Sequence, residues 1–240
     1  MIRFFLLSLL VISCLIVAGA PAASAQSTDR AGLLVKLDSL RDQQQKKEAT
    51  FLAPAAEDFA AYSEFLKQPD TGMARLMPRE KYDGTLLING GGAYYSFTRL
   101  TNEYGYGSDI ELQQGKLQVG FAGADFGFMT SLGDVPIDSV TADDPGIHFL
   151  ADFNTPSAEA EARAQYRRSG EGFMAEGFTY RNSLTATSNT SYALRSISYG
   201  DSDVLVALRV TRQDADGSVV LAWKVLKRFP VPQLVRTPEL

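Results

Sequence analysis

NGGGAYYSFTRLTNEYGYG, residues 89–107, is the stretch on which the predicted fold depends. It is dense in glycine and aromatic residues and lies within residues 84–133, where apolar side chains recur with the period of two that is typical of strands. We interpret it as the first half of an antiparallel sheet whose aromatic face either forms the core or lines a binding surface. Strands are predicted at residues 85–88, 93–100, 108–113, 116–122 and 126–131, with a tight turn at Gln114 and Gly115.

The last third of the chain carries the clearest β pattern. Residues 191–199, 203–213 and 218–229 predict a three-stranded meander, in which every second residue of the last two strands is apolar. Residues 214–217 supply a turn, because Gly217 can take a positive φ. The tail, residues 230–240, contains three prolines and cannot continue as a central strand.

Helical patterns precede the sheet. Residues 26–70 predict a helical hairpin: a first helix starting near Arg30, capped by Thr28 or Asp29, and a second at 55–67. We expect the leucines of the first helix to pack and residues 42–48 to face solvent; a short coiled coil is the alternative. Residues 68–83 are expected to be a loop.

One β-rich domain, residues 84–229, is expected to follow this hairpin. Within it, residues 147–153 predict a further strand, and Thr155, Pro156 and Gly170 punctuate a surface helix. The chain is therefore predicted to be an α+β protein with an antiparallel, meander- or sandwich-like sheet body.

Residues 1–25 have the parts of a secretory signal peptide: Arg3, an apolar run, and small residues before Gln26. We expect a mature chain that starts at Gln26 and is secreted or periplasmic, without a transmembrane segment. Lipidation of Cys14, the single cysteine, is the alternative. Loss of Arg3 would change the net charge from −5 to −6, which argues against a nucleic-acid partner.

Few residues suit catalysis or cofactor binding. His148 is the single histidine, so a multi-histidine zinc site is excluded, and we expect it on a strand surface. The glycines at 90–92 lead into a predicted strand rather than a helix, which favours a turn over a phosphate loop. Asp214 and Asp216 resemble a fragment of a calcium loop, but a hairpin turn explains them. No cofactor and no metal site are predicted.

Carboxylates offer the remaining route to hydrolysis. Asp109 and Glu111 would share one strand face about 7 Å apart, a spacing that a paired-carboxylate glycosidase can use. Any Asp-x-Glu in a strand meets this condition. A secreted, carboxylate-dependent hydrolase acting on glycans is therefore the alternative function.

Tyrosines supply the leading functional hypothesis. Tyr94, Tyr104 and Tyr106 are candidate ligand-binding residues. Tyr94 lies on the strand face opposite Tyr95, and Tyr104 and Tyr106 lie in a turn, where tyrosines present a flat apolar ring with a polar tip. In the alternative, Tyr104 and Tyr106 cover a sheet edge. Tyr95, Phe97 and Trp223 are expected in the core. We expect an exported, non-catalytic protein that binds a protein, a glycan or another cell-envelope ligand through this Tyr/Gly-rich surface. A third hypothesis is an envelope protein that assembles through its first helix.

Overall fold

The computed structural model describes residues 22–105, 107–121 and 123–235, with side chains described from residue 29 onward. It divides the chain into two compact units, Met1–Gln43 and Gln44–Leu240. Cys14 and most of the predicted signal peptide lie outside the described residues. Residues 236–240 of the Pro-rich tail also lie outside them. These predictions therefore remain predictions.

Helix α1 (Ala22–Leu52) begins before the predicted start, so Thr28 and Asp29 lie inside it rather than capping it. Within the first unit its leucines are exposed: Leu33, Leu37 and Leu40 each expose more than half of their surface. The prediction that residues 42–48 face solvent is wrong at Glu48. Its carboxylate is buried, and it accepts hydrogen bonds from the backbone N–H groups of Leu87 and Ile88.

The second unit is built on a five-stranded antiparallel sheet of order β1-β11-β10-β9-β5. The strands are β1 (Thr71–Leu76), β5 (Phe126–Gly133), β9 (Thr190–Ser198), β10 (Ser202–Gln213) and β11 (Val219–Arg228). The predicted meander is confirmed as β9–β11, and Gly217 in its second turn has a φ of 90°. The predicted loop at 68–83 is wrong, since it contains the edge strand β1.

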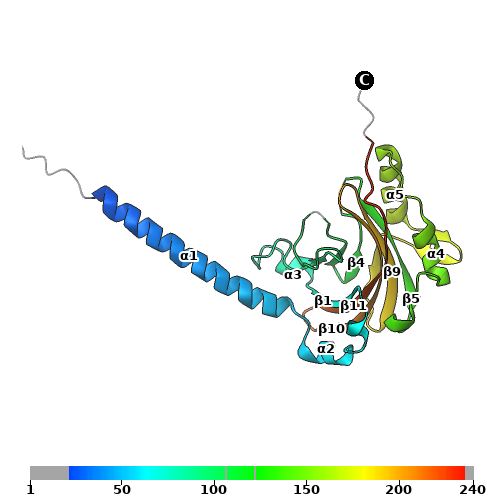
Figure 1. The fold of residues 1–240 in the computed structure, drawn as a ribbon, viewed down its shortest axis with the longest axis horizontal. Coiled ribbons are helices and arrows are strands. Elements are labelled where there is room, and N and C mark those ends of the chain that lie inside the picture. The colour runs from blue at the N-terminus through cyan, green and yellow to red at the C-terminus, as the bar shows by residue number, and fades with distance from the viewer. Residues whose placement is uncertain (1–21, 106, 122, 236–240) are drawn as a thin grey trace, which may run out of the picture. The chain divides into compact units, whose positions relative to one another are not determined.

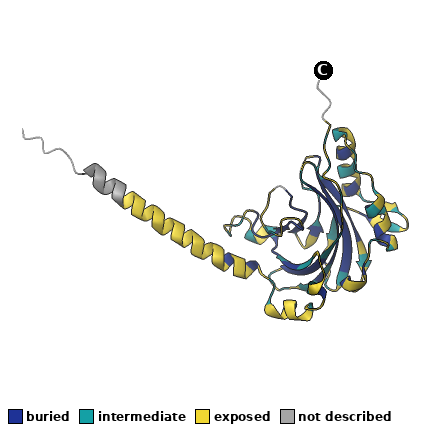
Figure 2. Ribbon diagram, in the orientation of Figure 1, coloured by how far each residue is buried: buried dark blue, intermediate teal, exposed yellow. Residues whose placement is uncertain are grey.

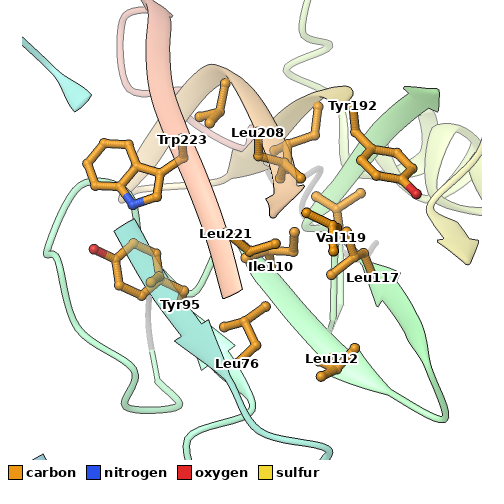
Figure 3. Packing of buried hydrophobic residues seen from close by; sticks show 14 of the residues in the cluster. Leu76, Tyr95, Ile110, Leu112, Leu117, Val119, Tyr192, Leu208, Leu221 and Trp223 are labelled. Atoms are coloured by element: carbon orange, nitrogen blue, oxygen red, sulfur yellow. The ribbon is translucent and has the colours of Figure 1, made fainter. Parts of the chain in front are cut away.

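A second antiparallel sheet, of order β2-β3-β4-β8, packs on one face of the first. Its strands are β2 (Tyr94–Tyr95), β3 (Ile110–Gln113), β4 (Lys116–Gln118) and β8 (Ser183–Thr185). The predicted turn at Gln114 and Gly115 joins β3 to β4. Leucine, valine and aromatic side chains from both sheets fill the space between them (Figure 3). Tyr95, Phe97 and Trp223 lie in this core, as predicted.

Helical elements cover the other face of the large sheet (Figure 1). They are α4 (Pro145–Asp152), α5 (Glu159–Glu171) and the 3-10 turns η1 (Phe65–Lys67) and η2 (Ile137–Ser139). The hairpin of β6 (Phe173–Ala175) and β7 (Phe178–Tyr180), which follows α5 in the chain, belongs to the same layer. The strands between these two layers are mostly buried (Figure 2). The α+β class with an antiparallel sheet body is confirmed. Two short helices, α2 (Ala56–Ala61) and α3 (Arg79–Tyr82), complete the unit.

Four other local predictions are wrong. Residues 147–152 belong to helix α4, in which Pro145 occupies the first turn and Ile147 and Leu150, three residues apart, are buried together. Residues 85–88 form turns, and only Tyr94–Tyr95 of the predicted strand 93–100 pairs in the sheet. Helix α5 starts at Glu159, because Thr155 instead hydrogen-bonds Asp203 and Arg195.

Candidate ligand-binding cavity

A cavity of about 340 Å³ lies beside the Tyr/Gly-rich stretch, between the two sheets. It forms where the inner face of β9 changes from apolar to polar. Tyr192 and Leu194 on that face belong to the core, whereas Ser196 and Ser198, the next residues with the same period of two, line the cavity. The full lining is Tyr104, Gly105, Gly107, Ser108, Gly120, Phe121, Asp125, Ser196 and Ser198.

Tyr104 lies at the rim of this cavity, in the loop between β2 and β3. Its backbone N–H donates to the carbonyl oxygen of Asn89 at 2.8 Å, and the Asn89 side-chain amide donates back to the Tyr104 carbonyl oxygen at 3.0 Å. The ring of Tyr104 contacts that of Tyr94, with centroids 4.5 Å apart. These contacts hold the Tyr104 ring in place while it remains 39% exposed.

Tyr94 lies beneath Tyr104 rather than at the surface. It is 3% exposed and also contacts Phe121 edge-on, with centroids 5.4 Å apart. Burial, and then the neighbouring Glu111 carboxylate, raise the pKa of the Tyr94 hydroxyl. Of the three tyrosines singled out from the sequence, Tyr104 lines the cavity, Tyr94 supports it, and Tyr106 lies outside the described residues.

Three carboxylates lie at or behind the cavity. Asp125 lines it and accepts a hydrogen bond from the Tyr199 backbone N–H at 2.9 Å. Burial raises the pKa of the Asp125 carboxyl, and the charge of Asp201 raises it further. Asp201, in the turn between β9 and β10, is paired with Arg99 at 2.6 Å.

Asp109 is the buried member of this group. It is fully buried, and its Oδ2 accepts a hydrogen bond from the Phe97 backbone N–H at 2.7 Å. Its Oδ1 has no hydrogen-bond partner among the described residues. Burial raises the pKa of Asp109 to about 6; the hydrogen bond from Phe97 N–H and the nearby Ser196 hydroxyl oppose the shift, and the charge of Asp201 adds to it. Because Ser196 lines the cavity, the Asp109 carboxyl lies directly behind the cavity wall.

Glu111 has different partners. It is 4% exposed and pairs with Arg79 at 3.0 Å, next to Tyr94. Asp109 and Glu111 therefore share no hydrogen-bond partner in the described part of the chain, and neither lines the cavity. This geometry gives no direct support to their action as a catalytic pair on one substrate.

The other residues considered for catalysis or metal binding make contacts within the fold. His148 is exposed on α4, not on a strand, and its Nε2 lies 2.7 Å from the carbonyl oxygen of Asp143. Asp214 pairs with Arg75 and Arg212, and Asp216 accepts from Ser218 and Tyr82. Within the described ranges, no three His, Cys, Asp or Glu side chains are grouped so that they could hold a metal ion. No described helix combines the length and the apolar character that crossing a membrane requires.

The sequence pointed to Tyr104 but missed the rest of the cavity. Phe121 falls in the predicted strand 116–122, and Asp125 falls between two predicted strands. Ser196 and Ser198 could have been found by extending the period-two pattern of β9 beyond Leu194. Comparisons with protein-family models, with curated proteins and with solved structures found no match.

Proposed function

We propose that this chain is an exported, non-catalytic binding protein and that its cavity at Tyr104 receives the end of a glycan of the cell envelope or of a partner molecule. One observation carries the proposal: an exposed tyrosine ring, a second aromatic ring, three serines and a carboxylate line one cavity. Aromatic faces suit the apolar face of a sugar, and hydroxyl and carboxylate oxygens suit its hydroxyl groups.

The size of the cavity supports the same function. Ligand sites typically have volumes of roughly 300–1,000 Å³ and combine apolar walls with a few polar groups. A cavity of about 340 Å³ is at the small end of that range, so it suits one terminal unit of a longer ligand rather than a whole chain. The signal-like leader supports export, which would bring the protein to extracellular or envelope glycans.

Binding of the purified protein to a glycan array, followed by calorimetry with the strongest ligand, tests the proposal. Tyr104→Ala is expected to weaken binding at least about tenfold, since it removes an aromatic contact that is typical of binding hot spots. Phe59→Ala is the matched control, because Phe59 in α2 has a similar exposure of 42% and does not line the cavity. Absence of binding to any glycan, or equal loss in both variants, would contradict the proposal.

One observation favours the alternative, a glycan hydrolase. Asp125 lines the cavity and its pKa is raised, as is typical of a carboxyl group that acts as a general acid. The hydrolase hypothesis therefore moves from Asp109 and Glu111 to Asp125. Incubation with the bound glycan and measurement of new reducing ends separates the two functions. Turnover that is lost in Asp125→Asn would support the hydrolase, whereas unchanged glycan supports binding alone.

A further inference from the structure

The walls of the Tyr104 cavity are acidic. Its lining contains one carboxylate, Asp125, and no lysine or arginine. Arg99 lies next to Gly107 of the lining, and it is already paired with Asp201 at 2.6 Å. The Arg99–Asp201 pair packs directly against Gly107, where an added Cβ would collide with the Asp201 carboxylate. Arg99 therefore balances Asp201 and leaves Asp125 without a cationic partner in the lining.

Asp109 gives a second, independent indication that the region lacks a positively charged partner. This fully buried carboxyl has one oxygen without a hydrogen-bond partner among the described residues, although it lies against Ser196 in the cavity wall. A buried carboxylate oxygen without a donor is costly. A positive charge in the adjacent cavity would lower that cost, because it would favour the ionised forms of Asp109 and Asp125 together.

We propose that the group bound in the Tyr104 cavity carries a protonated amine, as in an amino sugar whose nitrogen is not acetylated. This inference rests on the proposed glycan-binding function and names the ligand class of the same site. An ammonium group can donate to Asp125, Ser196 and Ser198, which line one cavity. The rings of Tyr104 and Phe121 also attract a cation that lies over their faces. A neutral sugar would use the rings and hydroxyls but not the negative charge.

The test compares two probes that differ in charge: a β-1,4-linked glucosamine tetramer and its N-acetylated counterpart, each titrated by calorimetry near neutral pH. We expect the free amine to bind about 10- to 100-fold more tightly, which is the range of one hydrogen bond to a charged group. Added salt should reduce this preference in the wild-type protein, because screening weakens the attraction between charges. The salt series needs no variant and so does not depend on a mutant folding.

Asp125→Asn should abolish most of the preference, because it removes the negative charge in the lining that distinguishes the two probes. Asparagine keeps the oxygen that accepts from Tyr199 N–H, so the local structure should be retained. Asp143→Asn is the charge-matched control, since Asp143 is exposed on the approach to α4 and does not line the cavity.

Four results would overturn the inference. Equal or tighter binding of the acetylated probe would do so, and so would a preference that survives Asp125→Asn or one that is insensitive to salt. If neither probe binds but another glycan on the array does, the amine inference fails and the proposed function stands. If no glycan binds at all, the proposed function fails as well.

Discussion

Different kinds of interaction determine the structure of the β9–β11 meander and of residues 84–107. The latter residues contain the Tyr/Gly-rich stretch and are called the Tyr/Gly-rich segment. In the meander, alternate residues face opposite layers: Val204, Val206 and Leu208 enter one core, and Leu205 and Ala207 enter the other. Among the described residues of the Tyr/Gly-rich segment, only Tyr94 and Tyr95 pair as a strand, and backbone groups bond distant side chains instead. Regular alternation is therefore sufficient to define the first region, whereas tertiary contacts define the second.

This difference explains where a binding site can arise. Most of β10 is buried on both faces and offers no free surface, whereas β9 reaches the cavity only through Ser196 and Ser198. A segment held by a few side-chain contacts can keep one ring, that of Tyr104, exposed at the rim of a cavity. We therefore expect the meander to carry most of the stability and the Tyr/Gly-rich segment to supply the exposed ring of the site.

The largest loss of stability is expected for Arg195→Met in the meander. Arg195 and Asp203 are each 2% exposed, and the guanidinium makes two 2.8 Å hydrogen bonds to that carboxylate. It also donates to the carbonyl oxygens of Leu150 and Phe153. Removing one partner leaves a buried unpaired charge, which costs about 3–5 kcal/mol of unfolding free energy.

Urea denaturation measures this loss. Arg163→Met provides the control, because Arg163 forms an exposed pair with Glu159 on α5 and should lose no more than about 0.5 kcal/mol. Similar losses in both variants would show that the buried pair does not hold the meander to α4.

Asp109→Asn should stabilise the protein at neutral pH by up to about 3 kcal/mol. The pKa of Asp109 rises from 3.8 to about 6 in the folded protein, so the native state prefers the protonated form. The stability contributed by that preference is present below about pH 4 and is lost as pH rises toward 6. The advantage of the variant should therefore grow between about pH 4 and pH 6 and then stay constant.

Thermal unfolding of both proteins across this pH range measures the difference. Asparagine retains an acceptor for Phe97 N–H, so the comparison isolates the charge. A variant that is less stable than the wild type at neutral pH would show that ionised Asp109 stabilises the fold.

Glu48→Gln tests how the Tyr/Gly-rich segment is held. Both carboxylate oxygens of Glu48 accept from the Leu87 and Ile88 backbone N–H groups, at 2.8–3.2 Å. The amide cannot replace both oxygens, so we expect a loss of about 1–2 kcal/mol. Hydrogen exchange at Leu87 and Ile88 should accelerate, while exchange in the meander should change much less. Glu57→Gln, at an exposed position in α2, should leave these amides unchanged.

The smallest effect is expected for Arg99→Ala. The arginine of the Arg99–Asp201 pair is about half exposed, so its loss should cost less than about 1 kcal/mol in thermal unfolding. The Tyr104 loop should keep its position through Asn89. A loss above about 2 kcal/mol would show that this pair, rather than Asn89, organises the loop.

The sequence predicted the elements whose apolar pattern is unambiguous. Val219, Leu221 and Trp223 alternate over a long strand, and β11 was found at nearly its observed bounds. β1 was missed because Pro69, Gly72 and Pro78 suggest a loop, yet Gly72 is required there since its backbone lies directly against the Trp223 ring. Helix α4 was taken for a strand because its apolar run is too short for its period to be decided.

The site was less predictable for a different reason. Tyr104 could be proposed from its composition and loop context. Asp125 and the serines of β9 become neighbours of Tyr104 only when the two sheets pack, and no local pattern encodes that pairing. Tyr94 and Tyr104 were both candidate binding residues, but the first is buried beneath the second.

The most direct test of the central claim is to locate the bound glycan by NMR, following backbone amide shifts while the strongest array ligand is titrated. The cavity proposal predicts that the largest changes occur at Gly105, Ser108 and Gly120, which line the cavity, and that Tyr104→Ala suppresses them. Shifts confined to other surfaces, such as α5 or the exposed face of α1, with these three amides unchanged, would contradict it.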